Sequence, residues 1–422
     1  MAAIQQFLQR LRRHGFILFL LVFVCVMVLL IMAAHHLPSK FATHLPSGGV
    51  SLLRDDQELS VYHERAEYVY HHMPPYAYAR IEYPLLGALY LGMPALFADN
   101  QAGYSLGLMI LNGLAGALLL YVTYRLLVWF NRPVSLLWLF LLPGVAYFTL
   151  NRFDILPALL VQVSLLLLFG KRWSWSFFFL GLSVLAKGYA VLLLPIFFIY
   201  WLNQTPETKR SLWNNRAVWL TAGTALVGII VSIALAGFQN GIFPYFFQST
   251  RSFGFGSIFT IFIVGIWDME GAAVAAALMR VSTKILILLQ FIVPALMYAG
   301  YSFFRRFIRK PENVINWSII VVLVYMLFSP YYSPQWLLWV VPLLIIWSPY
   351  RLAAWFVAAF GLMAYLEYPV AINIFGFESI NYNMLVLLRT VLLVGMVVVV
   401  SQQIRRYNNQ DEKIIPQITS GK

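Results

Sequence analysis

Acidic and histidine side chains gather in one stretch near the N-terminus. Six of the sixteen acidic residues and six of the seven histidines fall between residues 35 and 82. The acidic ones are Asp55, Asp56, Glu58, Glu64, Glu67 and Glu82. Carboxylates can act as general acids or bases, and beside apolar surface they are costly unless they are solvated, paired or used in chemistry. The alternative is that this stretch is simply the wet part of the protein.

The histidines do not have the spacing of a metal site. His71 and His72 are adjacent, and neither HxxxH nor HExxH occurs, although such spacing puts two ligands on one helix face. The single cysteine, Cys25, excludes both a cysteine metal site and an intramolecular disulfide. We therefore expect no metal.

The rest of the chain is strongly apolar. Of its 422 residues, 61% are hydrophobic and 11% are charged, and the mean hydropathy is +0.77. Soluble domains are about 45–50% apolar and about 25% charged. Lipid must be the solvent for most of this chain, which excludes a cytosolic enzyme, a secreted domain and a nucleic-acid reader. The net charge of +13 does not favour nucleic acid, because the basic residues form short clusters between apolar runs.

The apolar runs predict an all-α polytopic membrane protein with about 10–13 transmembrane or re-entrant helices. They must be helices, because a backbone in lipid has to satisfy its own hydrogen bonds. The first run, Phe16–Ala34, is too long for a typical signal sequence. Two pieces fit only as half-length or re-entrant helices: residues 134–150, and the pair 175–186 and 189–201, which meet at Lys187-Gly188. We expect one transmembrane domain over residues 1–407 and a polar cytoplasmic tail over 408–422.

Basic clusters predict which side of the membrane each loop faces, because they favour the cytoplasmic side. Both termini are then cytoplasmic, and residues 36–82 form the first outer loop. An active site built on that loop would lie on the extracytoplasmic face. The clusters are Arg10–Arg13, Lys171–Arg172, Lys209–Arg216, Arg305–Lys310 and Arg405–Arg406.

Five segments carry motifs in a consistent order. They are Glu58 with Val61-Tyr62, Pro75-Tyr76 and Glu82-Tyr83-Pro84 in the first loop, then Asn151–Ala158, Gly181–Pro195, Arg251 with Ser257, and Ser329–Trp339. In residue type and order they resemble the GT-C superfamily of membrane glycosyltransferases, specifically glycosyltransferase family 87. That family includes polyprenol-phosphate-mannose-dependent mannosyltransferases. The resemblance runs over most of the chain and implies a GT-C type fold with a functional first outer loop.

The activity implied by the resemblance is transfer of a hexose. The donor would be a polyprenyl-phosphate sugar, mannose in the relatives, and the acceptor a hydroxyl of a glycolipid or glycan. One carboxylate acting as base and no covalent intermediate fits inversion, whereas retention usually needs a second placed carboxylate. No cofactor is required beyond the lipid-linked sugar, because lysine and arginine can stabilise a lipid monophosphate leaving group.

The identity of the base stays open at this point. The first-loop acid of the family is usually Asp, but the residue at the matching distance from Val61-Tyr62 is Glu58. A small register shift selects Asp56 instead, and Asp55 lies beside it. Leu85 stands where the family has a second proline after Tyr83-Pro84, which is a further departure.

Two cations are candidates for the donor phosphate. Lys187 interrupts an apolar hairpin, and the alternatives for it are snorkelling or pairing with Asp154. Arg251 lies in a long outer segment, and the alternative for it is a surface charge. Arg152 and Asp154 are two residues apart and are candidates for substrate binding, although they fit an internal ion pair that holds the loop geometry better than direct catalysis.

Three further residues could contact the sugar. Glu82 could do so, or it could cap the helix that it opens, because acids suit helix N-termini. Tyr332 and Gln335 could line a sugar pocket, although aromatic residues at membrane interfaces also form belts.

Two other classes of function remain as alternatives. A transporter or lipid flippase often shows internal repeats and charges on broken helices near the midplane, whereas this chain shows no evident repeat and its charges gather at one face. A noncatalytic assembly protein would not need a carboxylate together with cations. The glycosyltransferase interpretation is favoured, with the lipid bilayer, the sugar donor and the acceptor as partners.

Overall fold

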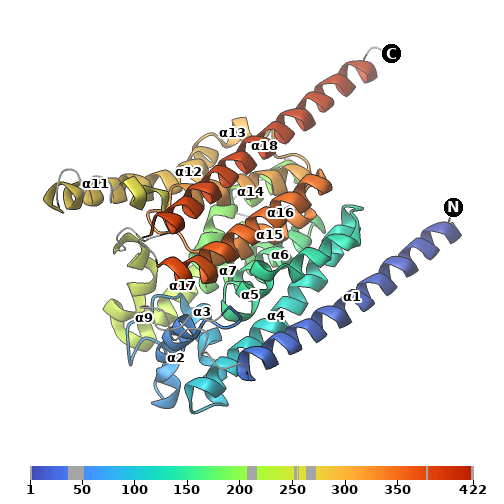
Figure 1. The fold of residues 1–422 in the computed structure, drawn as a ribbon. Coiled ribbons are helices and arrows are strands. Elements are labelled where there is room, and N and C mark those ends of the chain that lie inside the picture. Colours follow the sequence, from blue (N-terminus) through green and yellow to red (C-terminus); the bar gives the residue numbers. More distant parts are fainter. Residues whose placement is uncertain are drawn as a thin grey trace. The chain divides into compact units, whose positions relative to one another are not determined.

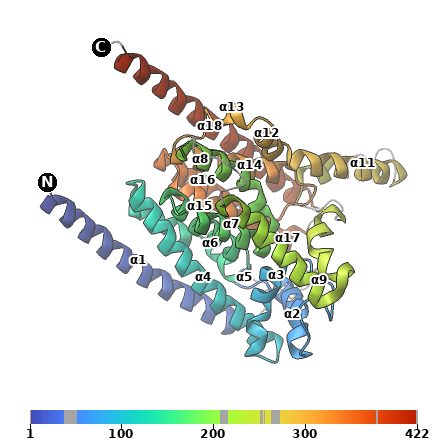
Figure 2. The same ribbon diagram turned by 180° about the vertical axis from the view of Figure 1, so that it is seen from behind.

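A computed structural model describes residues 2–36, 52–206, 216–250, 254, 256–262, 272–376 and 379–419. These residues form helices joined by turns and contain no β-strand, so the predicted all-α class is confirmed (Figures 1 and 2). In the part of the chain that is described, five helices are long and apolar enough to cross a membrane. They are His14–His36, Gln101–Trp129, Trp219–Phe247, Tyr350–Phe375 and Ile380–Arg406.

Several apolar helices are broken or short, as the sequence predicts. Val134–Leu141 and Pro143–Asn151 meet at a bend of 69°, and Ala277–Gln290 meets Ile292–Ala299 at 44°. Six more apolar helices of 10–17 residues occur among the described residues. Lys187 separates two of them, because the helix before it ends at Ala186 and the next begins at Gly188.

The chain divides into two compact units, which are treated separately below. Unit 1 comprises residues 1–191, 217–251 and 333–386, and unit 2 comprises residues 192–216, 252–332 and 387–422. The elements of unit 1 are α1 (Ala2–His36), α2 (Asp56–Tyr70), α3 (Leu85–Gly92), η2 (Pro94–Leu96), α4 (Gln101–Trp129), η3 (Val134–Leu141), α5 (Pro143–Asn151), α6 (Ile155–Phe169), α7 (Trp173–Ala186), most of η4 (Gly188–Leu193), α9 (Arg216–Thr250), η6 (Pro334–Trp336), α15 (Leu337–Ile346), α16 (Tyr350–Tyr365), η7 (Leu366–Ala371), α17 (Ile372–Phe375) and the start of α18 (Ile380–Thr419).

Unit 1 is built on a group of packed apolar helices. α6 packs against α7 and α4, and α1 runs alongside α4, as both ribbon views show (Figures 1 and 2). The short helices α2 and α3 pack against each other, α2 also contacts α4, and α3 contacts α7. α2 is polar, and Asp56, Glu58 and Glu64 are three of its acidic residues. It is therefore a helix that tolerates water, packed against an apolar bundle.

Glycines allow two pairs of elements in unit 1 to approach closely. A Cβ on Gly144 of α5 would lie 2.1 Å from the carbonyl oxygen of Gly361 on α16. A Cβ on Gly87 of α3 would lie 2.5 Å from the carbonyl oxygen of Ala186 on α7. Contacts this short exclude any larger side chain unless the backbones move apart. The glycines therefore set how near α5 lies to α16 and α3 to α7.

Unit 2 contains α8 (Leu194–Gln204), α11 (Ala272–Gln290), α12 (Ile292–Ala299), α13 (Tyr301–Phe304), α14 (Pro311–Leu327) and most of α18. α14 packs against α8 and α11, and α12 packs against α8. Asn203, near the end of α8, donates from its side-chain nitrogen to the carbonyl oxygens of Arg305 and Ile308, both at 2.9 Å. These bonds join the end of α8 to the turn that precedes α14.

Candidate active site

The first acid of the outer-loop stretch, Asp55, is fully buried and serves as the N-cap of α2. Its carboxylate accepts a hydrogen bond from the backbone N–H of Glu58 at 3.1 Å. Its own backbone N–H donates to the side-chain oxygen of Asn151 at 2.9 Å. Asn151 also donates to the carbonyl oxygen of Leu53 at 3.1 Å. An N-cap aspartate satisfies a backbone N–H that the helix leaves unpaired, so Asp55 fixes the start of α2 against the end of α5.

Arg152 bridges two of the candidate acids. Its Nη2 atom is hydrogen-bonded to Asp55 Oδ2, and its Nη1 atom lies 2.7 Å from Glu58 Oε1. The second oxygen of Asp55, Oδ1, also accepts a hydrogen bond from the Tyr368 hydroxyl at 2.8 Å. The guanidinium carbon of Arg152 lies 5.2 Å from the centre of the Tyr368 ring. One buried arginine therefore holds two carboxylates and rests on an aromatic face.

The two carboxylates differ in environment. Asp55 has no exposed surface, whereas Glu58 keeps 26% of its side chain exposed. Burial raises the pKa of Asp55, and the attraction of Arg152 offsets only part of that effect. Burial also opposes ionisation of Glu58, but the charge and hydrogen bond of Arg152 outweigh it and lower the pKa of Glu58. Glu58 is thus an ionised carboxylate that a ligand can reach.

Asp154, two residues after Arg152, forms a second ion pair with Lys187. Lys187 Nζ donates to both oxygens of Asp154, at 2.7 and 2.8 Å. The indole N–H of Trp339 donates to Asp154 Oδ1 at 2.8 Å. Lys187 also lies 4.9 Å from the ring centre of Phe153 and 5.5 Å from that of Trp339. Asp154 is fully buried, and Lys187 keeps 17% of its side chain exposed.

The predicted ion pair between Arg152 and Asp154 is wrong. Each residue pairs with a different partner: Arg152 with the acids at the start of α2, and Asp154 with Lys187 at the α7 break. The physical reason is direction. Arg152 is an extended residue after α5, and Asp154 is the first residue before α6, so their side chains reach different neighbours. The alternative that Lys187 pairs with Asp154 is confirmed.

Phe153 joins the two ion pairs through an aromatic cluster. Its ring is edge-on to Tyr62, with centres 5.7 Å apart, and to Tyr83, with centres 4.7 Å apart. Tyr62 lies one helical turn after Glu58. Its hydroxyl is buried and has no hydrogen bond of regular geometry. The hydroxyl nevertheless lies close enough to Glu58 to help lower the pKa of that acid. The polar residues therefore lie beside a wall of aromatic side chains. Carbohydrate sites often combine these two kinds of contact.

Two of the candidate acids lie outside this arrangement. Asp56 pairs with Arg54, with Oδ1 and Nε 2.5 Å apart. Glu82 pairs with Arg65 of α2, with Oε2 and Nε 2.8 Å apart. The prediction that Glu82 caps the helix it opens is wrong, because Pro84 is the N-cap residue of α3 and no side chain caps that helix. Glu82 instead ties the α2–α3 connection back to α2.

The remaining predicted residues are distributed over both units. Gln335, in unit 1, accepts a hydrogen bond from Ser333 at 2.5 Å. Its neighbour Trp336 stacks on Trp339, with ring centres 4.8 Å apart. Tyr332 belongs to unit 2, where its ring lies 3.5 Å from the guanidinium carbon of Arg389. Arg251 lies outside the described residues.

Three residues that sequence reasoning did not assign contribute to the site: Asn151, Trp339 and Tyr368. Asn151 and Trp339 stand within segments that the motifs cover. Their place in these motifs could therefore have identified them as candidate site residues. The pattern Asp55…Glu58, with an N-cap acid followed three residues later by glutamate, is typical of a helix start and could have identified Asp55 as a cap. Tyr368 stands between Glu367 and Pro369, and an acid within an apolar run is a signal that could have drawn attention to this segment.

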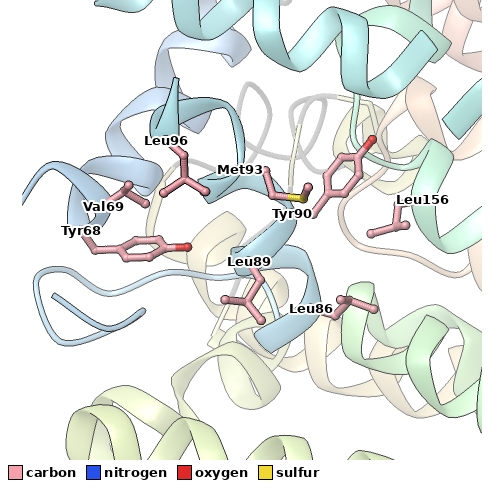
Figure 3. Close-up of a pocket in the computed structure, with 9 residues that line it drawn as sticks. Tyr68, Val69, Leu86, Leu89, Tyr90, Met93, Leu96 and Leu156 are labelled. Atoms are coloured by element: carbon pink, nitrogen blue, oxygen red, sulfur yellow. The ribbon is translucent and has the colours of Figure 1, made fainter. Parts of the chain in front are cut away.

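An apolar pocket lies near this arrangement in unit 1. Its volume is about 330 Å³, and Figure 3 shows residues of α3 and η2 between Tyr68 on one side and Leu156 on the other. Leu156 follows Asp154 by two residues, which connects the pocket wall to the second ion pair. Leu89, Met93 and Leu96 on this wall are also exposed at the surface. The lining consists of Tyr68, Val69, Leu86, Leu89, Tyr90, Gly92, Met93, Leu96 and Leu156.

The chain matches the model of one protein family. The model of glycosyltransferase family 87 matches residues 82–330. No curated protein matches the chain. The matched region contains Arg152, Asp154 and Lys187, whereas Glu58 precedes it and Tyr368 follows it. Because the match covers more than half of the 422 residues and the described chain is rich in membrane-spanning helices, the protein belongs to glycosyltransferase family 87 and is a membrane glycosyltransferase.

Proposed function

We propose that this glycosyltransferase moves a hexose, mannose by resemblance, from a polyprenyl-phosphate donor to a hydroxyl of a glycolipid or glycan. The transfer would invert the anomeric centre and take place on the extracytoplasmic face. The observation that carries the proposal is Glu58, a partly exposed carboxylate held by Arg152 beside the Asp154–Lys187 pair.

Glu58 is the proposed base. A general base must be ionised and within about 3 Å of the proton that it takes. Glu58 has a lowered pKa and a partly exposed side chain, whereas Asp55 is enclosed by Arg152 and Tyr368. Asp56 is partly exposed as well, but its partner is Arg54 and not Arg152. Of the three candidate acids, Glu58 is the one that is both partly exposed and paired with Arg152.

The proposed reaction is a single displacement. The acceptor oxygen attacks the anomeric carbon, the bond between that carbon and the phosphate oxygen breaks, and its electron pair leaves with the phosphate. Glu58 takes the acceptor proton. A retaining mechanism needs a second carboxylate as nucleophile about 5 Å from the first, and the nearest candidate, Asp55, is fully buried. That burial favours inversion.

The donor phosphate requires cations. Lys187 and Arg152 are the cations of the site, and the exposed part of Lys187, 17% of its side chain against 6% for Arg152, makes it the better candidate for contact. Arg251, outside the described residues, remains a second candidate. The apolar pocket beside Leu156 is a suitable environment for part of an isoprenoid chain. No cofactor besides the lipid-linked sugar is part of this proposal.

The experiment is a transfer assay with the protein purified in detergent. Radiolabelled polyprenyl-phosphate-mannose is the donor, and a crude membrane-lipid extract supplies acceptors. Wild type is compared with Glu58→Gln, with Lys187→Ala and with Asp56→Asn, the matched control two residues away. We expect Glu58→Gln to lose at least a hundredfold in rate, because one acid–base group contributes about 10²–10⁴-fold, and Asp56→Asn to stay within threefold of wild type.

Other results would contradict specific parts of the proposal. Loss in Asp56→Asn with retention in Glu58→Gln would move the base to Asp56. A product with the same anomeric configuration as the donor, determined by NMR, would exclude inversion. Transfer from a glucose donor but not from mannose would change the sugar and leave the mechanism in place.

A further inference from the structure

Tyr368 belongs to the C-terminal part of unit 1, far along the chain from the proposed base. It lies in η7, which directly follows α16, and is almost fully buried. Its φ and ψ angles, −145° and 119°, are extended within an otherwise helical stretch. This local change of direction lets its side chain reach Asp55, a partner 313 residues earlier in the sequence.

Tyr368 contacts both members of the buried ion pair between Asp55 and Arg152. Its hydroxyl donates to Asp55 Oδ1 at 2.8 Å, while the other oxygen of Asp55 binds Arg152 Nη2. Its ring lies 5.2 Å from the guanidinium carbon of Arg152. Tyr368 therefore contacts both members of the buried pair, and the three side chains form a closed set.

This closed set determines where the remaining nitrogen of Arg152 points. A guanidinium is planar, so fixing Nη2 on Asp55 and the face on Tyr368 leaves little rotation for Nη1. Nη1 is the atom that lies 2.7 Å from Glu58 Oε1. The orientation of Glu58 thus depends on a residue that does not touch it.

We infer that Tyr368 is a positioning residue, which orients the Glu58 carboxylate for catalysis through Asp55 and Arg152. The inference rests on the proposed function, because it gives Tyr368 a role only if Glu58 is the base. Tyr368 lies outside the family match of residues 82–330, so the site is completed by a part of the chain that the match does not cover.

The alternative is that Tyr368 is a buried tyrosine with a satisfied hydroxyl and no influence on catalysis. Tyr365 provides the matched control. It lies three residues earlier and donates its hydroxyl to the carbonyl oxygen of Leu52 at 2.9 Å. It also contacts the Tyr147 ring, as Tyr368 does, with ring centres 5.7 Å apart against 6.4 Å. Changing either tyrosine to phenylalanine removes one hydroxyl from the same region, but only Tyr368 reaches Asp55.

The experiment measures kcat and KM for the sugar donor, and the melting temperature, in wild type, Tyr368→Phe, Tyr365→Phe and Glu58→Gln. We expect kcat of Tyr368→Phe to fall at least tenfold while KM stays within twofold, because a misdirected base affects the transition state and not ground-state binding. We expect kcat of Tyr365→Phe to stay within twofold of wild type. In an Asp55→Asn background, adding Tyr368→Phe should lower kcat by less than twofold, because the ion pair through which Tyr368 acts on Arg152 is already lost.

Each result bears on one of the two claims. Equal kcat values in the two phenylalanine variants, or a rise in KM that accounts for the loss in Tyr368→Phe, would overturn the positioning role while leaving the function intact. Full activity in Glu58→Gln would instead overturn Glu58 as base, and with it the inference. If Asp55→Asn does not fold, the kcat and KM comparison between the two phenylalanine variants decides by itself.

Discussion

At the scale of single residues, Arg152 has two acidic partners that use it differently. With Asp55 it forms a buried pair, in which each charge needs the other because neither has water. With Glu58 it holds a carboxylate that keeps part of its surface exposed. Loss of the first contact should lower both the stability of the protein and the alignment of Glu58, whereas loss of the second should mainly affect the chemistry.

Replacing Arg152 by methionine should strongly destabilise the protein, because it leaves the Asp55 charge buried without a partner. Removing one member of a buried pair costs about 3–5 kcal/mol. The double variant Arg152→Met/Asp55→Asn should recover most of the melting temperature in detergent but none of the transfer activity. Recovery of activity along with stability would show that Arg152 is dispensable for chemistry.

The pH dependence of transfer should follow Glu58. Arg152 lowers the pKa of Glu58 below that of an ordinary glutamate, so the carboxylate stays ionised as the pH falls from neutrality and takes up a proton only below the range in which an ordinary glutamate does so. Initial rates, corrected for the folded fraction at each pH, should therefore be flat on the acid side down to that region. A midpoint near pH 6 would point to a different base.

At the scale of elements, the close approach of α5 and α16 positions the ends of both helices. Arg152 directly follows α5, and Tyr368 follows α16 by three residues. Gly144 and Gly361 allow these helices to touch. The distance between the backbones of α5 and α16 therefore affects where Arg152 and Tyr368 lie in the site.

Adding a methyl group at this contact should disturb the site. Gly144→Ala places a Cβ 2.1 Å from the carbonyl oxygen of Gly361, so α5 and α16 must separate. Such overpacking costs about 1–3 kcal/mol, and kcat should fall with the melting temperature. Gly113→Ala on α4 is the control, because its nearest neighbour would be Leu150 Cδ2 at an ordinary 3.8 Å. Equal behaviour of the two variants would argue against this coupling.

At the scale of the whole molecule, the distribution of basic residues predicts the orientation in the membrane. The predicted outer loop contains the turn between α2 and α3, where Tyr78 is exposed. The predicted cytoplasmic side contains the turn between α6 and α7, where Arg172 is exposed. Family membership establishes the glycosyltransferase class, whereas the extracytoplasmic face of action stays a prediction from the basic residues.

Cysteine labelling should report that orientation directly. In a Cys25→Ser background, which removes the single native cysteine, Tyr78→Cys should react with a membrane-impermeant maleimide on intact cells. Arg172→Cys should react only after permeabilisation. The reverse pattern would put the site on the cytoplasmic face.

Much of the fold could be predicted because membrane helices follow local rules. Apolar length and the break at Lys187 are properties of short segments, and both correspond to elements of the described structure. The candidate acids of the first loop could also be found, because carboxylates are rare in an apolar chain.

The pairing of the charges could not be predicted from the same rules. Arg152 and Asp154 are neighbours in sequence, but the bends on both sides turn them toward different partners. Glu367 marks the segment of Tyr368 beside it, but only the packing of α16 against α5 reveals the contact of Tyr368 with Asp55. Contacts that depend on tertiary packing leave no periodic signal in a single sequence.

The distance of 313 residues between Asp55 and Tyr368 has a consequence for biosynthesis. At 5–20 residues per second, a ribosome needs roughly 15–60 s to proceed from one to the other. During that time Asp55 and Arg152 can already form their ion pair, but Tyr368, which orients them, has not yet been synthesised. The enzyme would therefore become competent only near the end of its insertion, and chains released early would carry the acids without the alignment that makes them useful.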